Sequence, residues 1–386
     1  MKSIQAIFIR ILSLLTICTR LWKSFPWLMA LSASSLTSRR LQEIRKSSVS
    51  ANEKSHTSYI DDNNGTVNCP TLLNELYNGN RLDPNNGLLH ARWTSLYPQF
   101  WIAVHKQSFD PVRYSIMDWG KYYEKDLSKA FIEILDKAAR TIVLDVGGNI
   151  GWFSLLSVSM GHDVYVWEPN PVNLNRLCQS LRLNGWDSQD NIPHRTAGEG
   201  SITIHARGIS DVEGHFWLEQ PIHGLSNGAS RVVTNQSDSN AIPVSVETLD
   251  KVALSRGWLS STSRKKGVTI AVLKVDVEGL ESQVFQGASK LLKSGVIENI
   301  FMEGNVGSKI ELSNFKSLCR QLFDSGYAVH RLGGSMGPRH SVDTLPNKNQ
   351  SQPSFIESLI YGCLGYKRQN RRQCNIWWKR KRDMTL

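Results

Sequence analysis

The stretch Asp145-Val146-Gly147-Gly148-Asn149-Ile150-Gly151-Trp152 indicates the fold of this 386-residue chain. It follows an apolar run, Thr141 to Leu144, that is typical of a buried strand, and it leads into an apolar helical pattern from Trp152 to Met160. A strand, a glycine-rich turn and a helix form the unit in which α/β proteins bind nucleotide-like cofactors. Glycine adopts a positive φ without a Cβ clash and lets the backbone approach a ligand, and Asn149 is the non-glycine residue best suited to such a turn.

The spacing of the glycines favours one kind of cofactor. Dinucleotide enzymes use G-x-G-x-x-G, whereas this loop reads G-G-N-I-G and is the arrangement found in Class I S-adenosylmethionine enzymes. A second apolar strand, His162 to Trp167, ends at Glu168. An acidic residue at this point can accept hydrogen bonds from both ribose hydroxyls of a cofactor. A solvated loop carboxylate is the alternative interpretation of Glu168.

A further apolar strand, Ile270 to Val275, runs directly into the acidic turn Asp276-Val277-Glu278-Gly279-Leu280-Glu281. Together with the glycine loop, W-E-P-N-P at 167–171 and V-E-T-L-D at 246–250, this pattern closely resembles the FkbM-type methyltransferases from about Thr141 onward. The resemblance implies a Class I, Rossmann-like α/β fold, with a seven-stranded, mostly parallel sheet that has one antiparallel strand and helices on both faces. It also implies S-adenosyl-L-methionine as donor and, usually, methylation of a hydroxyl oxygen on a sugar or polyketide-like acceptor.

The resemblance and the strand ends together indicate the site residues. The expected cofactor-binding residues are Asp145, Gly147, Gly148, Asn149, Gly151, Glu168 and Asp211, the last being either an adenine contact or a plain turn former. The expected catalytic residues are Asp276, Glu278 and Glu303, because each follows a strand at the edge where α/β ligands bind. Carboxylates grouped there could remove a proton, bind a sugar hydroxyl or hold a divalent ion.

Two charged residues near this edge call for a structural interpretation. Glu281 is expected to interact with the positive end of the helix that it begins. Lys274 lies within an otherwise apolar strand, and a buried charge needs a partner, so Asp276 or Glu303 is expected beside it.

The pattern predicts the remaining elements of the domain. They are helices over Lys125–Arg140 and Pro171–Asn184, strands over Ile202–Ile209 and Val296–Met302, a closing antiparallel pair over Tyr327–Leu332 and Asn375–Lys379, and long loops over Pro221–Asn240 and Gly333–Pro353. No cysteine or histidine pattern suggests a metal site. We expect Cys178 to be a buried thiol, and a disulfide among Cys319, Cys363 and Cys374 stays open.

The net charge of +11 resides at the two ends of the chain. Residues 1–46 carry +7 and residues 367–382 carry +8, so the rest carries −4. Nucleic-acid binding needs Lys and Arg on the folded body. We therefore expect no nucleic-acid partner.

The first part of the chain does not belong to the α/β pattern. Residues 1–46 combine two apolar runs with basic residues and no acid before Glu43, which is typical of a membrane signal anchor, a cleaved signal peptide or an organellar transit peptide. We favour a single-pass membrane segment that directs the protein to the secretory pathway (endoplasmic reticulum or Golgi) over targeting to mitochondria or plastids. Residues 47–70 are expected to be a flexible stem, residues 71–140 a helical extension or lid, and residues 141–386 the methyltransferase domain.

The extension contains a cluster of aromatic residues, Trp93, Tyr97, Phe100 and Trp101. Core packing is its default interpretation and stacking on a sugar ring is the alternative.

Three functions therefore compete. The first is an S-adenosylmethionine-dependent O-methyltransferase acting on a glycan, glycolipid or similar small acceptor. The second is an inactive adaptor that keeps the cofactor fold. The third is a nicotinamide-dependent oxidoreductase, which the glycine spacing and the acidic turn disfavour.

Overall fold

The structure is a computed structural model. It describes residues 59–61, 64–77, 89–106, 111–118, 122–187, 200–219, 231–233, 241–259, 268–306, 309–333 and 372–381. The chain separates into two units, residues 1–58 and 59–386, and all described residues belong to the second. The expected targeting segment and the loop Gly333–Pro353, apart from Gly333, lie outside the described residues. None of the helices in the described part of the chain has the length and apolar composition of a membrane span.

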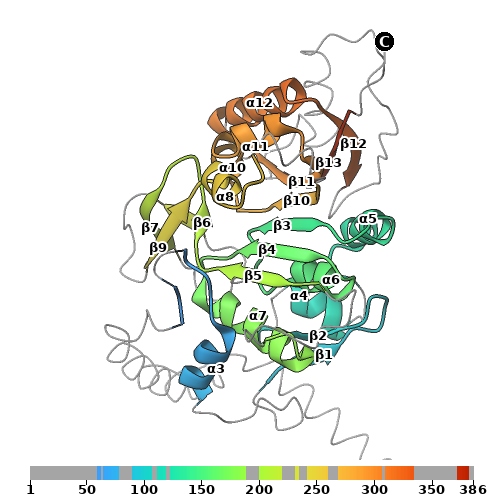
Figure 1. Cartoon of the computed structure of the whole chain (residues 1–386), viewed down its shortest axis with the longest axis vertical. Helices are drawn as coiled ribbons and strands as arrows, with labels where there is room; N and C mark the ends of the chain where they lie inside the picture. The colour runs from blue at the N-terminus through green and yellow to red at the C-terminus, as the bar shows by residue number, and fades with distance from the viewer. Residues whose placement is uncertain are drawn as a thin grey trace, which may run out of the picture. The chain divides into compact units, whose positions relative to one another are not determined.

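A seven-stranded sheet forms the centre of the second unit (Figure 1). Its order is β12-β13-β11-β10-β3-β4-β5. The strands are β3 (Ile142–Val146), β4 (Asp163–Trp167), β5 (Ile202–His205), β10 (Ile270–Val275), β11 (Ile297–Val306), β12 (Tyr327–Gly333) and β13 (Arg372–Arg380). Only β13 runs against its neighbours β11 and β12, whereas the other pairs are parallel. This topology confirms the predicted Class I methyltransferase sheet.

The strand order reverses between β3 and β10, which lie side by side although more than a hundred residues separate them. In an open α/β sheet, ligands bind at the carboxyl ends of the strands beside such a reversal. The glycine loop follows β3 and the acidic turn follows β10. The fold therefore brings the two motifs together.

Helices cover both faces of this sheet, and each face has its own hydrophobic cluster. The helices of one face are α8 (Leu249–Ser255), α10 (Glu281–Gln286), α11 (Ser289–Ser294) and α12 (Lys309–Asp324), and those of the other are α3 (Cys69–Tyr77), α5 (Lys125–Asp136), α6 (Trp152–Ser159) and α7 (Pro171–Asn184). Side chains alternate between the two faces along a strand, so Val143 joins one cluster and Leu144 the other. Because α3 and α5 share a cluster with α6 and α7, the extension is part of the domain core.

Local signals fix the best-predicted helix, α7. The side chain of Asn170 accepts a hydrogen bond from the Val172 N–H, Pro171 occupies the first turn, and Gly185 ends the helix at φ 71°. Each of these is a standard boundary signal. Its bounds therefore agree with the prediction, whereas α5 ends at Asp136, before the predicted Arg140.

A second, four-stranded sheet corrects two predictions. Its order is β6-β9-β7-β8, with β6 (Gly208–Ile209), β7 (Gly214–Glu219), β8 (Arg231–Val233) and β9 (Ile242–Glu247). The predicted strand Ile202–Ile209 is broken, because β5 pairs with β4 and β6 leaves to pair with β9. The predicted loop Pro221–Asn240 contains β8, and its other residues lie outside the described ones.

The segment before the sheet is attached more firmly than predicted. Residues from 59 onward, expected in a flexible stem, bind the domain: the Val67 N–H donates to the Ile204 carbonyl (2.9 Å), and Thr66 bridges to His205. Cys69 forms a disulfide with Cys178, with 5.1 Å between their Cα atoms, so the expected free thiol at Cys178 is wrong. Cys319 is a free, buried thiol, and Cys363 lies outside the described residues.

The rest of the extension is short and irregular. It consists of a hairpin of β1 (Ala91–Trp93) and β2 (Trp101–Ala103), followed by α4 (Pro111–Arg113) and a π-helical turn η2 (Tyr114–Asp118). β2 lies against α7, where the Ala103 N–H donates to Ser180 Oγ (2.9 Å). This contact places the hairpin beside α7.

Candidate functional site

The glycine loop after β3 has a left-handed backbone at three residues. Gly147, Asn149 and Gly151 have φ of 79°, 50° and 90°, which glycine and asparagine tolerate best. A Cβ on Gly147 would lie 1.8 Å from the Asp276 carbonyl oxygen, and one on Gly151 would lie 2.3 Å from Leu177 Cδ1. Contacts within the protein therefore require glycine at these positions. The sequence had suggested only that glycine lets the backbone approach a ligand.

Gly148 has the same kind of constraint, since its Cβ would lie 2.2 Å from Val166 Cγ2. The loop is thus pressed against β4 on one side and against the turn after β10 on the other. Its shape is fixed by the packed sheet, which is what a preformed binding loop requires.

Glu168, at the end of β4, holds this loop. Its carboxylate accepts hydrogen bonds from the Asn149 N–H (2.8 Å) and from the Asn170 N–H (2.8 Å). The side chain is buried, so the solvated-loop alternative is wrong. Burial raises the pKa of Glu168 to about 7, although the two N–H groups favour its charged form.

The loop also offers polar groups to a ligand. Asn149 Oδ1 is buried and makes no hydrogen bond with the described part of the chain. The first turn of α6 has no side-chain cap, because its N-cap residue is Gly151. Unpaired N–H groups at a helix start favour a carboxylate or phosphate. The loop, Glu168 and the start of α6 therefore fit a nucleoside cofactor that carries a carboxylate.

Asp145 supports the loop from within the sheet. It is buried, its Oδ2 accepts a hydrogen bond from Ser154 Oγ (2.7 Å), and its Oδ1 lies 3.7 Å from Lys274 Nζ. Asp145 thus bonds Ser154 of α6 and pairs with Lys274 of β10.

Lys274 has the partner predicted from the sequence and one more. Its Nζ lies 3.2 Å from Asp276 Oδ2, in addition to the contact with Asp145 on the neighbouring strand β3. Glu303, the other predicted partner, makes no ion pair with it among the described residues. Burial acts to lower the pKa of Lys274, but nearby carboxylates hold it above its usual value. Lys274 thus stays charged and fixes Asp276.

The carboxylates of this edge differ in their surroundings. Asp276 keeps 29% of its side chain exposed. Glu303 lies within β11, which is longer than predicted, and burial followed by the charges of Asp276 and Glu278 raises its pKa to about 9. Glu303 is therefore protonated near neutral pH and can donate a hydrogen bond. Glu278 has a left-handed backbone with φ 56°.

Glu281 stabilises the acidic turn itself. Its Oε1 accepts hydrogen bonds from the Gly279 N–H (3.1 Å) and the Val277 N–H (3.3 Å), and burial raises its pKa to about 7. Glu281 lies in the first turn of α10, where the helix-end interaction was expected, and its side chain in addition bonds the loop that precedes the helix.

Glu124 is a member of this edge that the sequence did not indicate. It precedes α5 with φ 41°, its Oε1 accepts a hydrogen bond from Asn375 Nδ2 (3.0 Å), and its Oε2 is buried without a hydrogen-bond partner among the described residues. Burial, and then the charge of Asp276, raise the pKa of Glu124. Glu is an unusual residue at an N-cap position, and this was the one feature of the sequence that could have pointed to Glu124.

The side chain of Asp211 bonds its chain neighbour. It is exposed, accepts a hydrogen bond from Ser210 Oγ (3.0 Å), and follows β6 of the second sheet. The turn-former alternative agrees with this position. The end of β5 carries His205 instead, whose ring stacks on that of Trp167 at 5.0 Å.

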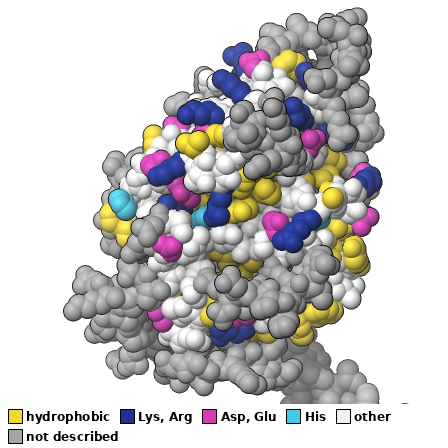
Figure 2. Space-filling model, viewed as in Figure 1, with side chains coloured by type: hydrophobic (Ala, Val, Ile, Leu, Met, Phe, Trp, Pro, Cys, Tyr) yellow, Lys and Arg dark blue, Asp and Glu magenta, His cyan; other side chains and the backbone are white. Residues whose placement is uncertain are grey.

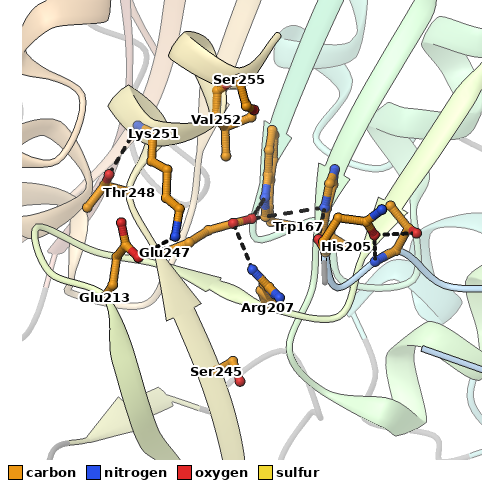
Figure 3. A network of polar contacts seen from close by, with 12 residues as sticks. Trp167, His205, Arg207, Glu213, Ser245, Glu247, Thr248, Lys251, Val252 and Ser255 are labelled. Atoms are coloured by element: carbon orange, nitrogen blue, oxygen red, sulfur yellow. Dashed lines mark hydrogen bonds and ion pairs between the residues drawn. The ribbon is translucent and has the colours of Figure 1, made fainter. Parts of the chain in front are cut away.

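The second sheet braces that end of the main sheet through Glu247 (Figure 3). Its carboxylate accepts hydrogen bonds from Trp167 Nε1 (2.9 Å) and Arg207 Nη1 (3.1 Å). In the same V-E-T-L-D motif, Thr248 caps α8. The carboxylate of Asp250 accepts hydrogen bonds from the N–H groups at the start of α11. The motif is therefore structural.

The described residues contain no group of three or more His, Cys, Asp and Glu side chains placed to hold a metal ion. Of the acids described above, Asp145 and Asp276 pair with Lys274.

The fold and the site define a Class I, S-adenosylmethionine-dependent methyltransferase. Residues 145–328 match the model of the methyltransferase FkbM domain, so this chain carries an FkbM methyltransferase domain. This family assignment confirms the resemblance seen in the sequence, and its cofactor is S-adenosylmethionine and not a nicotinamide. No curated protein shows significant sequence similarity to the chain.

Solved structures give distant matches. A SAM-dependent methyltransferase from Agrobacterium tumefaciens is 9% identical, with 78% of this chain and 72% of that chain covered and a TM-score of 0.35. Magnesium protoporphyrin IX methyltransferase from Synechocystis PCC 6803 with bound SAM is 8% identical, with 72% and 86% covered and a TM-score of 0.32.

Proposed function

We propose that this methyltransferase transfers the methyl group of S-adenosylmethionine to a hydroxyl oxygen of a glycan, a glycolipid or a similar small acceptor. The observation that carries this proposal is the partly exposed Asp276 carboxylate, which Lys274 holds at the carboxyl edge of the sheet beside the glycine loop. A hydroxyl acceptor must lose a proton, and a fixed carboxylate at the site of reaction can take it.

The residues around the glycine loop would hold the cofactor. Glu168 would accept hydrogen bonds from the ribose hydroxyls of the cofactor. Asn149 and the start of α6 would bind its remaining polar groups. The bound cofactor supplies an activated methyl group. The protein's part is then to align the acceptor and exclude water.

The edge residues would divide the work on the acceptor. Asp276 would orient the hydroxyl and take its proton, while Lys274 keeps that carboxylate in place. Glu303, protonated near neutral pH, would donate a hydrogen bond to the acceptor. Glu278 would contribute a further carboxylate from the same turn.

We also propose that the protein matures in the secretory pathway. The Cys69–Cys178 disulfide supports this compartment, since disulfides persist in oxidising environments. The basic, apolar start of the chain agrees with entry into that pathway.

Incubation of the full-length protein with methyl-labelled S-adenosylmethionine and a panel of glycans and glycolipids tests the proposed reaction. Label in the acceptor, resistant to mild base and located at an ether oxygen by mass spectrometry, is the expected result. Label on nitrogen or on a carboxyl group would overturn the O-methyltransferase assignment. Cofactor binding without turnover on any acceptor class would favour the adaptor alternative.

A further inference from the structure

The tripeptide Asn64-Gly65-Thr66 has the Asn-X-Thr pattern, or sequon, that accepts an N-linked glycan in secreted proteins. A sequon arises easily by chance in a chain of this length, so its place in the fold decides whether it can carry a glycan. Asn64 is exposed, whereas Gly65 is buried. The structure thus turns the asparagine to solvent and the middle residue of the sequon to the protein.

Contacts with the end of β5 fix this arrangement. The Ala206 N–H donates to the Gly65 carbonyl (2.9 Å). Thr66 bridges to His205, so the segment before α3, blue in Figure 1, lies beside β5. Gly65 has φ 69°, and a Cβ there would lie 2.2 Å from Arg207 Nε. On the face that Figure 2 shows, acidic and basic side chains are intermixed, as on a solvated surface.

The side-chain amide of Asn64 has one position left for a sugar. Its Oδ1 accepts hydrogen bonds from the Thr66 N–H (2.8 Å) and from Thr66 Oγ1 (2.6 Å). Its Nδ2 carries two hydrogens and donates to Asp61 Oδ2 (2.8 Å), which is its one acceptor in the described part of the chain. An amide that has gained a sugar keeps one hydrogen, and the contact with Asp61 needs no more than that.

The order of synthesis gives the sequon time to react before it docks. Asn64 lies 141 residues before His205, whose Nδ1 contacts the Asn64 carbonyl oxygen (3.2 Å). The sequon cannot dock on β5 until those residues have been made, which takes roughly 7–30 s at about 5–20 residues per second. Until then it belongs to an unfolded chain, and a transferase can reach both its backbone and its asparagine side chain.

We propose that Asn64 is an N-glycosylation site. This inference rests on the secretory maturation proposed above, which the Cys69–Cys178 disulfide also supports, and it is independent of the methyl acceptor. Asn64 Nδ2 forms a bond to the anomeric carbon of an oligosaccharide carried on a lipid diphosphate. The bond between that carbon and the diphosphate oxygen breaks, the lipid diphosphate leaves, and Nδ2 loses one proton. Nothing is oxidised or reduced in this transfer.

Glycopeptide mass spectrometry of the full-length protein, expressed with its own N-terminal segment in insect cells, tests the site. We expect a glycan on the peptide that contains Asn64, and its removal by peptide-N-glycosidase. Thr66→Ala destroys the sequon but keeps the asparagine, and it should abolish the glycan on Asn64. Thr66→Ser keeps the hydroxyl and should retain the glycan. Disulfide mapping of the same digests shows whether each variant has formed Cys69–Cys178 and is folded.

The chain offers matched controls in two further sequons, Asn235-Gln236-Ser237 and Asn349-Gln350-Ser351, which lie outside the described residues. Asn235→Gln and Asn349→Gln should each leave the glycan on Asn64 in place. Asn64→Gln should remove that glycan and leave any glycan on the other two sequons unchanged. A glycan that persists on the Asn64 peptide of Thr66→Ala would overturn the assignment to this sequon.

Failure of this site and failure of the proposed function give different results. An unmodified Asn64 in protein that contains the Cys69–Cys178 disulfide would overturn the site and retain the secretory compartment. An unmodified Asn64 in protein that lacks this disulfide would overturn the site and reject the compartment. A glycan on Asn64 of a protein that methylates no glycan or glycolipid would retain the site and reject the proposed reaction.

Discussion

Four neighbouring carboxylates of the acidic edge have different roles because their neighbours differ. Glu281 accepts hydrogen bonds from two N–H groups of the loop. Glu303 is half-buried beside other acids, and its raised pKa of about 9 keeps it protonated near neutral pH. Asp145 lies inside the sheet against Ser154. Asp276 alone of these combines an ion pair with Lys274 and a partly exposed side chain. At the scale of single residues, hydrogen bonding within the protein therefore separates Asp145 and Glu281 from Asp276 and Glu303, the two that we propose to contact the acceptor.

Asp276→Asn should lower turnover roughly 10²-fold or more, as for loss of a general base. Cofactor affinity and melting temperature should stay near those of the wild type, because Asp145 remains as a partner of Lys274. Steady-state kinetics, calorimetry and thermal melting measure the three quantities. Glu133→Gln, an exposed carboxylate paired with Lys137, controls for loss of charge. A stable variant with near wild-type turnover would remove Asp276 from the catalytic residues and leave Glu278 as the next candidate.

Cofactor affinity should depend on the protonation of Glu168. Its pKa is about 7, so the carboxyl is mostly neutral below that pH and mostly charged above it. Only the charged form accepts hydrogen bonds on both oxygens, and binding of S-adenosylmethionine should weaken as the pH falls through 7.

The matched variant is Glu168→Gln, which should weaken binding by about 1–3 kcal/mol at pH 8 and remove this pH dependence. Calorimetry between about pH 6 and pH 8 provides the measurement. An affinity that is independent of pH in the wild type would exclude Glu168 from the ribose site.

At the scale of elements, packing rather than the ligand explains the glycine loop. Gly151 has φ 90° and lies against Leu177 of α7, so a larger residue there would disturb the contact between the loop and the helix. Substitution of this glycine should therefore reduce stability together with cofactor binding. Glu168 is the better position for testing the cofactor site alone.

The disulfide joins α3 to α7 across 109 residues of sequence. A cross-link over so long a segment restricts the unfolded chain, and its loss typically costs roughly 2–5 kcal/mol of stability. Cys69→Ser should therefore lower the melting temperature of the protein.

Reductant should produce a similar loss in the wild type and no further loss in Cys69→Ser. Thermal melting with and without reductant makes the comparison. The disulfide would contribute no stability if reductant left the melting temperature of the wild type unchanged and Cys69→Ser melted at that same temperature.

At the scale of the whole molecule, the methyltransferase unit begins at Tyr59, and the basic, apolar start of the chain precedes it. Residues 1–46 fused to a fluorescent reporter should direct it to the secretory pathway, as fluorescence microscopy with organelle markers will show. A chain that starts near Ser50 should still bind cofactor, since the contacts of Val67 and Cys69 remain. Import of the reporter into mitochondria or plastids would reject the secretory assignment and leave the enzyme assignment intact.

Features that depend on neighbouring residues could be predicted from the sequence. The bounds of β10 and α7 agree with the prediction, because an apolar run defines the strand and Asn170, Pro171 and Gly185 mark the ends of the helix. The glycine loop, the acidic turn and the family were recognisable for the same reason, since each is a short continuous motif.

Features that join distant parts of the chain follow from tertiary contacts. The pairing of Cys69 with Cys178 and the position of Glu124 beside Asn375 depend on contacts across 109 and 251 residues. The break after β5 arises because β9, later in the sequence, offers β6 another partner. Local patterns specify which residues form an element, but the neighbours of that element follow from the packing of the whole sheet.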